Sequence, residues 1–375
     1  MNHKIAVIGM GYIGNVHLEA LKRIGLDIAA VSDTDTASCA RSAQKFGIGQ
    51  SYGDYRQLLD QADIDAVHIC TPNHLHYEIA MEALKRGLHV YCEKPLALCA
   101  AEAETLAEAA ERAGVIAGVN FNYRYYPAVQ HARGMVQNGE VGKVYIITGG
   151  YLQDWLLYDT DYNWRLEPEI GGVSRAMADI GAHWCDLAQH VTGLRITEVM
   201  ADLMTVHTVR KKPLAAAQTF QKAAQGTYEE RPMDTEDYGG VLVRFENGAK
   251  GVFCVSQVSA GQKCRIRLEV YGSKESVSWD HEQANSLWVG SRDEGCRIVE
   301  KGVPVMNAEG ARFAHYPAGH PEGYPDVVKN ACIDFYACID TGFSQTLPTF
   351  RDGLNACRIV EAVLKSDKEK RWVSI

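Results

Sequence analysis

A glycine-rich turn between an apolar strand and a helix constrains the fold of this chain more than any other feature. Lys4–Ile8 is typical of a strand, and an amphipathic helix is expected from about Asn15 to Ile24. Between them lies Gly9-Met10-Gly11-Tyr12-Ile13-Gly14, a G-x-G-x-x-G pattern in the strand–turn–helix setting that dinucleotide binding requires. The first glycine permits the turn, the second lets backbone approach a pyrophosphate, and the third lets the helix pack close to the strand. The helix N-terminus then meets the pyrophosphate charge.

An acidic residue follows at the position that decides cofactor choice. A second predicted strand, Asp27–Ser32, ends at Asp33, nineteen residues after Gly14. A carboxylate here hydrogen-bonds the ribose hydroxyls and repels a 2′-phosphate. The next residues are Thr34 and Asp35, so no arginine follows at once to accept a phosphate. The sequence therefore predicts NAD as cofactor, with NADP less favoured, and disfavours a plain strand–helix turn.

The alternation of strands and helices continues through the first third of the chain. Strands are expected at 65–70 and 115–119, with helices at about 74–86 and 101–113. Such alternation indicates a parallel sheet covered on both faces. We therefore predict an α/β protein whose N-terminal Rossmann domain spans residues 1–124.

The pattern changes after Arg124. A helix is expected at 127–138, and helices return at about 326–341 and 352–366. Extended runs without intervening helices occur at 144–149, 196–206, 239–245, 250–258 and 265–271. Glu246-Asn247-Gly248 is a hairpin signal. We predict a C-terminal α+β domain over 125–375 with a large, mostly antiparallel sheet, and a long mobile loop over 207–235.

Composition narrows the class of protein. A length of 375 residues favours two domains, and a formal net charge of −9 disfavours nucleic acid or an anionic membrane as partner. No apolar run reaches the length of a membrane span, and Met1–Lys4 leads directly into a strand, so we expect no signal peptide. The 11 cysteines show no paired C-x-x-C spacing. This indicates free thiols, a cytoplasmic location and no metal site.

A lysine follows another predicted buried strand, Leu88–Cys92. Glu93-Lys94-Pro95 comes directly after it, at the carboxyl end of the strand. Ligands of open α/β sheets bind at such ends. A lysine there can donate a hydrogen bond to an oxygen on which charge develops. Taken alone, the same three residues also fit a surface ion pair.

A second group of candidate catalytic residues lies in the stretch Asp179-Ile180-Gly181-Ala182-His183. At the start of a helix, residues four apart lie on the same face. A histidine is a suitable proton acceptor near neutral pH, and a neighbouring carboxylate can orient it. The alternative is that Asp179 caps a helix and His183 only packs at an interface.

Aromatic residues cluster around these motifs and have two interpretations. They can be core residues, or they can stack on the C–H faces of a sugar. The cluster consists of Tyr123, Tyr125, Tyr126, Tyr151, Trp155, Tyr158, Tyr162 and Trp164.

In order and spacing, these motifs resemble those of the Gfo/Idh/MocA family, and the resemblance covers nearly the whole chain. The residues that carry it are the glycine motif, Thr71-Pro72-Asn73 with His76, Glu93-Lys94-Pro95, Asn120–Arg124, and Asp179–His183 after Gly171-Gly172.

The resemblance implies a Rossmann domain followed by a domain whose open sheet face forms dimers or tetramers. It implies catalytic roles for Lys94, Asp179 and His183, with His183 as proton acceptor, and a cis Lys94–Pro95 peptide. The cofactor contacts expected are Gly9, Gly11, Tyr12, Ile13, Gly14, Asp33, Thr71, Asn73, His76, Glu93, Lys94 and Asn122. The substrate contacts expected are Lys94, Tyr123, Arg124, Trp155, Trp164, Arg165, Asp179, His183 and His320.

Two stretches resemble the branch of sugar, levoglucosan and inositol dehydrogenases. One is 154–166, and the other is the loop Tyr316–Tyr324. The second implies His320 as a sugar ligand, although the loop can equally be structural. Arg175 departs from the family pattern, and we expect it to contact a charged or hydroxylated substrate or to point into solvent.

The function expected is NAD-dependent oxidation of a secondary hydroxyl of a sugar or cyclic polyol by hydride transfer. Two alternatives stay open. One is a glycosidase or hydratase that oxidises its substrate transiently, and the other is a non-catalytic NAD-binding regulator on the same fold.

Overall fold

The computed structural model describes residues 3–214 and 228–375 and divides into two compact units. The first unit is Met1–Tyr125 with Glu322–Cys357, and the second is Tyr126–Pro321 with Arg358–Ile375. The boundary at Tyr125 lies one residue after the expected one. The second unit is not continuous in sequence, which differs from the expectation of one domain over 125–375.

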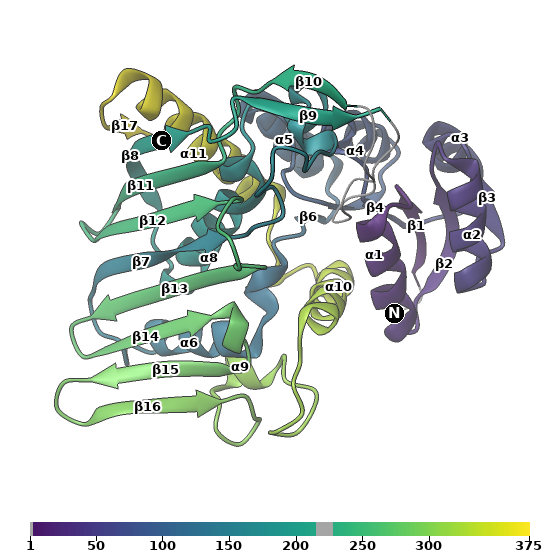
Figure 1. Ribbon diagram of the computed structural model, residues 1–375. Coiled ribbons are helices and arrows are strands. Elements are labelled where there is room, and N and C mark those ends of the chain that lie inside the picture. The colour runs from purple at the N-terminus through teal and green to yellow at the C-terminus, as the bar shows by residue number, and fades with distance from the viewer. Residues whose placement is uncertain (1–2, 215–227) are drawn as a thin grey trace. The chain divides into compact units, whose positions relative to one another are not determined.

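The first unit contains a six-stranded, fully parallel sheet in the order β3-β2-β1-β4-β5-β6. Its strands are β1 (Lys4–Ile8), β2 (Asp27–Ser32), β3 (Gln50–Tyr52), β4 (Ala66–Ile69), β5 (His89–Cys92) and β6 (Ala117–Val119). Its helices include α1 (Tyr12–Arg23), α2 (Thr36–Phe46), α3 (Tyr55–Gln61), α4 (His76–Lys85) and α5 (Ala100–Ala113), labelled in Figure 1. All four residues of β4 are buried, as in a strand covered on both faces. The predicted Rossmann sheet is confirmed.

A late segment of the chain returns to this unit. Helix α10 (Tyr324–Thr341) lies against the sheet, where the Tyr336 hydroxyl is 2.8 Å from His68 Nε2 on β4. The backbone N–H of Val119 also donates to the carbonyl of Pro348 at 2.8 Å. These contacts explain why residues 322–357 do not belong to the second unit. Helix α11 (Phe350–Glu369) begins in the first unit and ends in the second.

The second unit contains a nine-stranded sheet in the order β16-β15-β14-β13-β7-β12-β11-β8-β17. Its strands are β7 (Val144–Leu152), β8 (Ile196–Met204), β11 (Tyr238–Phe245), β12 (Lys250–Ser256), β13 (Arg265–Gly272), β14 (Glu275–Asp280), β15 (Ser286–Ser291), β16 (Gly295–Glu300) and β17 (Val373–Ser374). Neighbouring strands are antiparallel except β7 and β12, which are parallel. The predicted large, mostly antiparallel sheet is confirmed.

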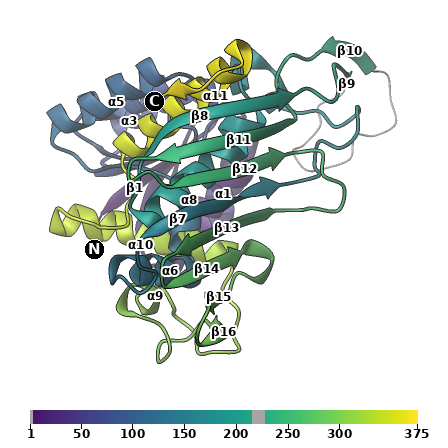
Figure 2. The same ribbon diagram turned by 90° about the vertical axis from the view of Figure 1, so that its left-hand side faces the viewer.

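Among the described residues, helices cover one face of this sheet and leave the other open. Helices α6 (Pro127–Gln137) and α8 (Ala182–Thr192) lie on the same side of the strands (Figures 1 and 2). The Trp184 ring stacks on Phe253 of β12, with ring centroids 4.3 Å apart. Val241 and Val243 are buried, whereas Leu242 between them is 46% exposed. This alternation is the pattern of a sheet with one covered and one open face.

The expectation of a mobile loop over 207–235 is wrong where the structure describes it. Strands β9 (Val209–Pro213) and β10 (Tyr228–Pro232) pair as an antiparallel two-stranded sheet. The β9 strand is fixed because Arg210 is fully buried and bonded to backbone carbonyls. Residues 215–227 of the same prediction lie outside the described residues.

All 11 cysteines lie in the described part of the chain, and none of them forms a disulfide. Among the described helices, none combines the length and apolar character needed to cross a membrane.

Candidate active site

The glycine turn of the first unit is built as a binding loop. Gly9 has φ +96°, and a Cβ there would lie 2.6 Å from the carbonyl carbon of Cys70. A Cβ on Gly14 would lie 1.8 Å from the carbonyl oxygen of Gly9. Gly11, in contrast, has no atom within 4 Å of a virtual Cβ. Two glycines therefore permit close packing, and the middle one leaves room at the surface of the turn.

Helix α1 begins at this turn without a side-chain cap. Its N-cap is Gly11, no capping hydrogen bond is present, and its first turn contains no acidic residue. The Asn15 side chain donates instead to the carbonyls of Met10 and Gly11, at 3.0 and 2.9 Å. Amide groups at an uncapped helix N-terminus favour an anion, so this end of α1 fits a pyrophosphate.

Asp33 is fixed at the end of β2 beside the same turn. Its Oδ2 accepts from the backbone N–H of Met10 at 2.6 Å, and its Oδ1 accepts from that of Asp35 at 2.8 Å. The carboxylate is therefore oriented before any ligand binds. Each oxygen keeps a further lone pair that can accept from a ribose hydroxyl.

His76 connects two other turns at the carboxyl ends of the strands. Its buried ring places Nδ1 2.7 Å from the carbonyl of Pro95 and Nε2 2.9 Å from that of Thr71. A neutral imidazole donates to only one of these carbonyls, and burial lowers the pKa of His76 despite both bonds. The Thr71 hydroxyl is buried without a hydrogen-bond partner in the described part of the chain. A buried hydroxyl of this kind is suited to a hydrogen bond with a polar ligand.

Glu93 is a buried brace next to Lys94. Its Oε1 accepts from His17 Nε2 at 3.1 Å and from Asn120 Nδ2 at 2.6 Å, and its Oε2 accepts from the backbone N–H of Lys94. Burial alone raises the pKa of Glu93, but the His17 and Asn120 hydrogen bonds and the Lys94 charge bring it to about 2. A carboxylate that stays ionised suits orientation of the turn better than proton transfer. The Lys94–Pro95 peptide is cis, as predicted.

The predicted contacts Asn122, Tyr123 and Arg124 lie together in a 3₁₀ turn, Asn122–Tyr125, and are buried. Arg124 Nη2 is 3.1 Å from Asp352 Oδ1, and its Nη1 donates to the carbonyl of Thr346. The guanidinium therefore fixes the start of α11 within the first unit, and its predicted substrate contact stays a prediction.

Asp179 and His183 lie on one continuous helical segment of the second unit. Asp179 lies inside a π-helical turn, Met177–Gly181, and His183 lies in the first turn of α8. Asp179 Oδ2 accepts from Gln257 Nε2 at 2.8 Å, and its Oδ1 is 3.6 Å from Arg165 Nε. Asp179 is not the N-cap residue of either helical element, so the alternative role of a helix cap is wrong. Single π-helical turns inside helices are frequent at functional sites.

His183 is 6% exposed and lies beside Tyr151, with ring centroids 6.2 Å apart. Burial limits the number of waters that can compete for its ring nitrogens.

The aromatic cluster divides into core and partly exposed residues. Four of its members are buried, namely Tyr123, Tyr125, Tyr126 and Tyr151. The other four are partly or fully exposed, namely Trp155, Tyr158, Tyr162 and Trp164. The Arg165 guanidinium carbon lies 4.2 Å from the Trp164 ring centroid, which links this group to Asp179. Trp155 Nε1 donates to Gln153 at 2.7 Å. The core interpretation is therefore confirmed for the four buried residues, and stacking on a sugar stays a prediction for the other four.

His320 is exposed in a turn of the second unit. Its backbone N–H donates to Pro317 at 3.2 Å, and the buried Lys301 ammonium donates to the carbonyl of Tyr316 at 2.8 Å. The loop is therefore a fixed structural turn that also presents an accessible imidazole.

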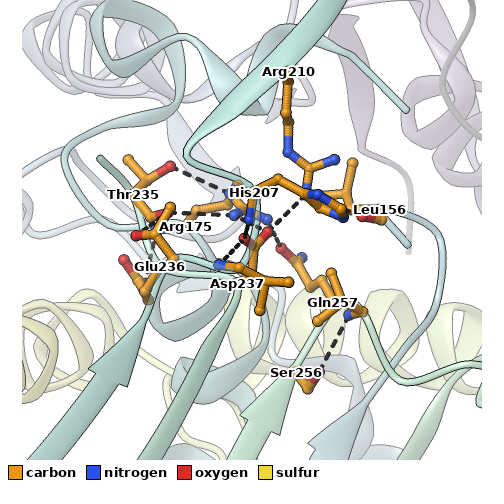
Figure 3. Close-up of polar contacts among 12 residues, drawn as sticks. Leu156, Arg175, His207, Arg210, Thr235, Glu236, Asp237, Ser256 and Gln257 are labelled. Atoms are coloured by element: carbon orange, nitrogen blue, oxygen red, sulfur yellow. Dashed lines mark hydrogen bonds and ion pairs between the residues drawn. The ribbon is translucent and has the colours of Figure 1, made fainter. Parts of the chain in front are cut away.

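The expectation that Arg175 points into solvent is wrong. It is 2% exposed and forms an ion pair with the fully buried Asp237 (Figure 3). Its contact with a substrate stays a prediction. Its Nη1 donates to Gln257 Oε1 at 3.0 Å. Gln257 was missed by sequence reasoning, because a glutamine just after a strand carries no motif. The burial of Arg175 was not predictable either, because its counter-charge, Asp237, lies 62 residues later in the sequence.

These features define the class of protein. An uncapped helix behind a glycine turn, the fixed Asp33 and the parallel sheet form an NAD-binding Rossmann fold, and the chain is an oxidoreductase of that class. Residues 3–121 match the family model of the oxidoreductase family with an NAD-binding Rossmann fold, and residues 129–278 match the GFO/IDH/MocA C-terminal domain. The chain belongs to the Gfo/Idh/MocA family. The predicted family, oxidoreductase class and NAD cofactor are confirmed.

Characterised proteins resemble the chain over its full length. It is 30% identical to levoglucosan dehydrogenase of Pseudarthrobacter phenanthrenivorans, over 100% of this chain and 98% of that protein. A structure of levoglucosan dehydrogenase in complex with NADH and L-sorbose superposes with a TM-score of 0.90 at 29% identity, over 100% of this chain and 99% of the other. An inositol dehydrogenase homologue of Azotobacter vinelandii, with NADH and myo-inositol, has a TM-score of 0.87 at 26% identity, over 100% and 98%.

Proposed function

We propose that this protein oxidises a secondary ring hydroxyl of a sugar or cyclic polyol, with NAD⁺ as the acceptor. The observation that carries the proposal is an intact Lys94, Asp179 and His183 set in a chain matched end to end with a levoglucosan dehydrogenase. The relatives' complexes with L-sorbose and myo-inositol support a polyhydroxylated substrate of this size.

The cofactor would be bound by Gly9–Gly14, the N-terminus of α1 and Asp33. NAD⁺ supplies the hydride acceptor when bound. Thr71, Asn73, His76, Glu93 and Asn122 are the further cofactor neighbours in this proposal, and Thr71 offers the orphan hydroxyl described above.

Proton transfer is assigned to three side chains. His183 accepts the proton of the reacting hydroxyl, because a neutral imidazole is a competent base near neutral pH. Asp179 stabilises the imidazolium that forms. Lys94 donates a hydrogen bond to the same oxygen and stabilises its developing negative charge.

Substrate recognition is assigned to the partly exposed side chains of the second unit. Trp155 and Trp164 offer faces for the C–H surface of a ring, while Arg165 and His320 offer polar contacts to hydroxyls. Tyr123 and Arg124 of the first unit complete the proposed set.

A panel of anhydrosugars, pyranoses and inositols, each with NAD⁺ and with NADP⁺, tests the proposal through the absorbance of reduced nicotinamide. We expect net NADH formation with at least one cyclic substrate and a loss of at least about 100-fold in kcat in Lys94→Ala and His183→Ala. Unchanged turnover in both variants would overturn the assigned roles.

The same panel separates the two alternatives. A glycosidase or hydratase with transient oxidation would release product without net NADH. A regulator would bind NAD⁺ tightly and turn over none of the substrates.

We also propose a cytoplasmic homodimer or homotetramer. Eleven cysteines without a disulfide fit a reducing compartment. The open sheet face exposes Ile146, Met200, Leu242 and Val252, and an apolar patch of this kind suits an interface. Light scattering on the native protein and on Leu242→Lys tests the assembly, and a monomeric native protein would contradict it.

A further inference from the structure

Gln257 occupies a fixed place between the candidate catalytic carboxylate and a buried ion pair. It follows β12, and its side chain is fully buried. Its Oε1 accepts from Arg175 Nη1 at 3.0 Å, and its Nε2 donates to Asp179 Oδ2 at 2.8 Å. One carboxamide therefore bridges a cation and a carboxylate within the second unit.

The orientation of this carboxamide follows from chemistry. A guanidinium has only donors, so the Gln257 atom that faces Arg175 must be the oxygen. The atom that faces Asp179 must then be the NH₂ group, which can only donate. Asp179 accepts this bond without rearrangement in its ionised form.

The backbone of Gln257 is also fixed on both sides. Its N–H donates to the carbonyl of Asp237 at 3.0 Å, and its carbonyl accepts from the N–H of Leu156 at 3.1 Å. A side chain with both ends and its backbone bonded has little freedom to rotate. The position of Gln257 therefore defines the position of the oxygen that it binds.

The ion pair behind Gln257 also fixes the aromatic segment. Asp237 Oδ1 accepts from Arg175 and, at 2.7 Å, from Arg210 Nη2, while Asp237 Oδ2 accepts from the backbone N–H of His207 at 3.1 Å (Figure 3). Arg210 donates in turn to the carbonyls of Leu156, at 3.0 Å, and Tyr158, at 2.9 Å. One buried carboxylate thus orients Gln257 through Arg175 and fixes the segment that follows Trp155.

We infer that Gln257 is a positioning residue that aims the Asp179 carboxylate for proton transfer, with Arg175 and Asp237 as its rigid support. The inference rests on the proposed function, because it assigns Asp179 to the acid–base set. The charged and titratable groups that the second unit places around the pair include Arg165 at Asp179 Oδ1, and Arg175 and Asp237 behind Gln257. They also include Arg210 at Asp237, Glu236 at the backbone N–H of Arg175, and His183 four residues along the helical segment.

Two substitutions test the hydrogen bond from Gln257 to Asp179. Gln257→Met keeps the length of the side chain but removes the donor, so we expect kcat to fall at least about 10-fold with little change in the Kd of NAD⁺. Gln257→Glu is nearly isosteric but donates to Asp179 only when protonated. Two carboxylates in contact share a proton more readily at low pH. The kcat of Gln257→Glu relative to wild type should therefore rise at least about 10-fold from about pH 8.5 to about pH 6.

Gln137→Glu, at an exposed position at the end of α6, controls for the added negative charge. The ratio of its kcat to that of wild type should stay constant with pH. A purely structural role for Gln257 would not produce a pH-dependent ratio. A wild-type kcat in Gln257→Met together with a constant ratio in Gln257→Glu would overturn the inference.

A readout without turnover separates this inference from the proposed function. All six tryptophans lie in the second unit, so their fluorescence reports its unfolding in urea. The destabilisation caused by Gln257→Met should be smaller in an Asp179→Leu background than in the wild type, since the bond is already lost. Additive effects would overturn the inference even if no substrate of the panel is oxidised. If the effects of the Gln257 and Asp179 substitutions on stability are coupled but no substrate is oxidised, only the proposed function is contradicted.

Discussion

The backbone N–H of Met10 donates to Asp33 Oδ2 across 2.6 Å, which ties the glycine turn to the end of β2. Asp33 therefore has a structural bond as well as the predicted contact with the ribose. Asp33→Asn removes the charge but keeps an oxygen that can accept from Met10. We expect the ratio of kcat/KM for NADP⁺ to that for NAD⁺ to rise at least about 10-fold, because the repulsion of a 2′-phosphate is lost. A preference unchanged from wild type would show that Asp33 does not select the cofactor.

Two glycines of the same turn give a matched pair. A Cβ at Gly14 meets the Gly9 carbonyl, so Gly14→Ala should destabilise the first unit by about 1–3 kcal/mol. A Cβ at Gly11 meets no atom, so Gly11→Ala should leave the unfolding free energy within about 0.5 kcal/mol of wild type. Gly11→Ala should nevertheless weaken NAD⁺ binding, measured by calorimetry, since backbone approaches the pyrophosphate there. Normal NAD⁺ affinity in Gly11→Ala would place the cofactor elsewhere.

Asp237 accepts from two buried guanidinium groups, so its loss should be costly. Asp237→Asn removes the buried carboxylate that pairs with both Arg175 and Arg210, and we expect about 3–5 kcal/mol of destabilisation by urea unfolding with tryptophan fluorescence. The exposed Lys370–Asp202 pair is the control, and Asp202→Asn should cost less than about 0.5 kcal/mol. A similar loss of unfolding free energy in the two variants would contradict a stabilising role for the buried Asp237 carboxylate.

Buried neutral histidines should make the first unit sensitive to acid. Burial lowers the pKa of His68 well below its usual value, with the neighbouring His17 as a smaller cause, and burial also lowers the pKa of His76. Their stabilisation is present above the unfolded pKa of about 6.5 and is lost as pH falls toward the folded values.

From about pH 7.5 to about pH 5.5, each histidine that stays neutral in the fold should therefore remove about 1 kcal/mol of unfolding free energy. Far-UV circular dichroism is the suitable probe, because the first unit contains no tryptophan. His68→Gln should reduce the dependence on pH. Equal stability at both pH values would contradict the burial of neutral rings.

The sequence predicted what depends on local pattern. The glycine turn, five of the six parallel strands and the long strands β7, β8, β11, β12 and β13 follow from residue pattern, and the structure has them close to the expected bounds. Strand β3 and strands β14 to β16 were not predicted. The return of α10 to the first unit was not predictable, because it depends on the contact of Tyr336 with His68, 268 residues away. Helix α2 was also missed. Its cap, Asp35 accepting from the backbone N–H of Ser38, lies two residues after Asp33, where the same acidic residues indicate cofactor choice.

In the candidate site, too, residues in local motifs were predictable, whereas residues brought together only by folding were not. Motif residues were found because a family pattern marks them, but their supports were not. Asp179 is oriented by Gln257, which follows a strand 78 residues later, and Gln257 by Arg175, whose burial depends on Asp237. Side chains of this kind have no periodicity or spacing, and only the folded chain brings them together.

The most direct test of the proposed dehydrogenase is to find where the hydrogen of the oxidised ring carbon is transferred. A substrate from the panel, deuterated at the carbon that is oxidised, is incubated with the wild-type protein and NAD⁺, and the reduced nicotinamide is analysed by mass spectrometry. Hydride transfer from the ring predicts one deuterium in each NADH formed. NADH without deuterium, or deuterium that stays in the sugar or enters the solvent, would contradict the proposed dehydrogenase.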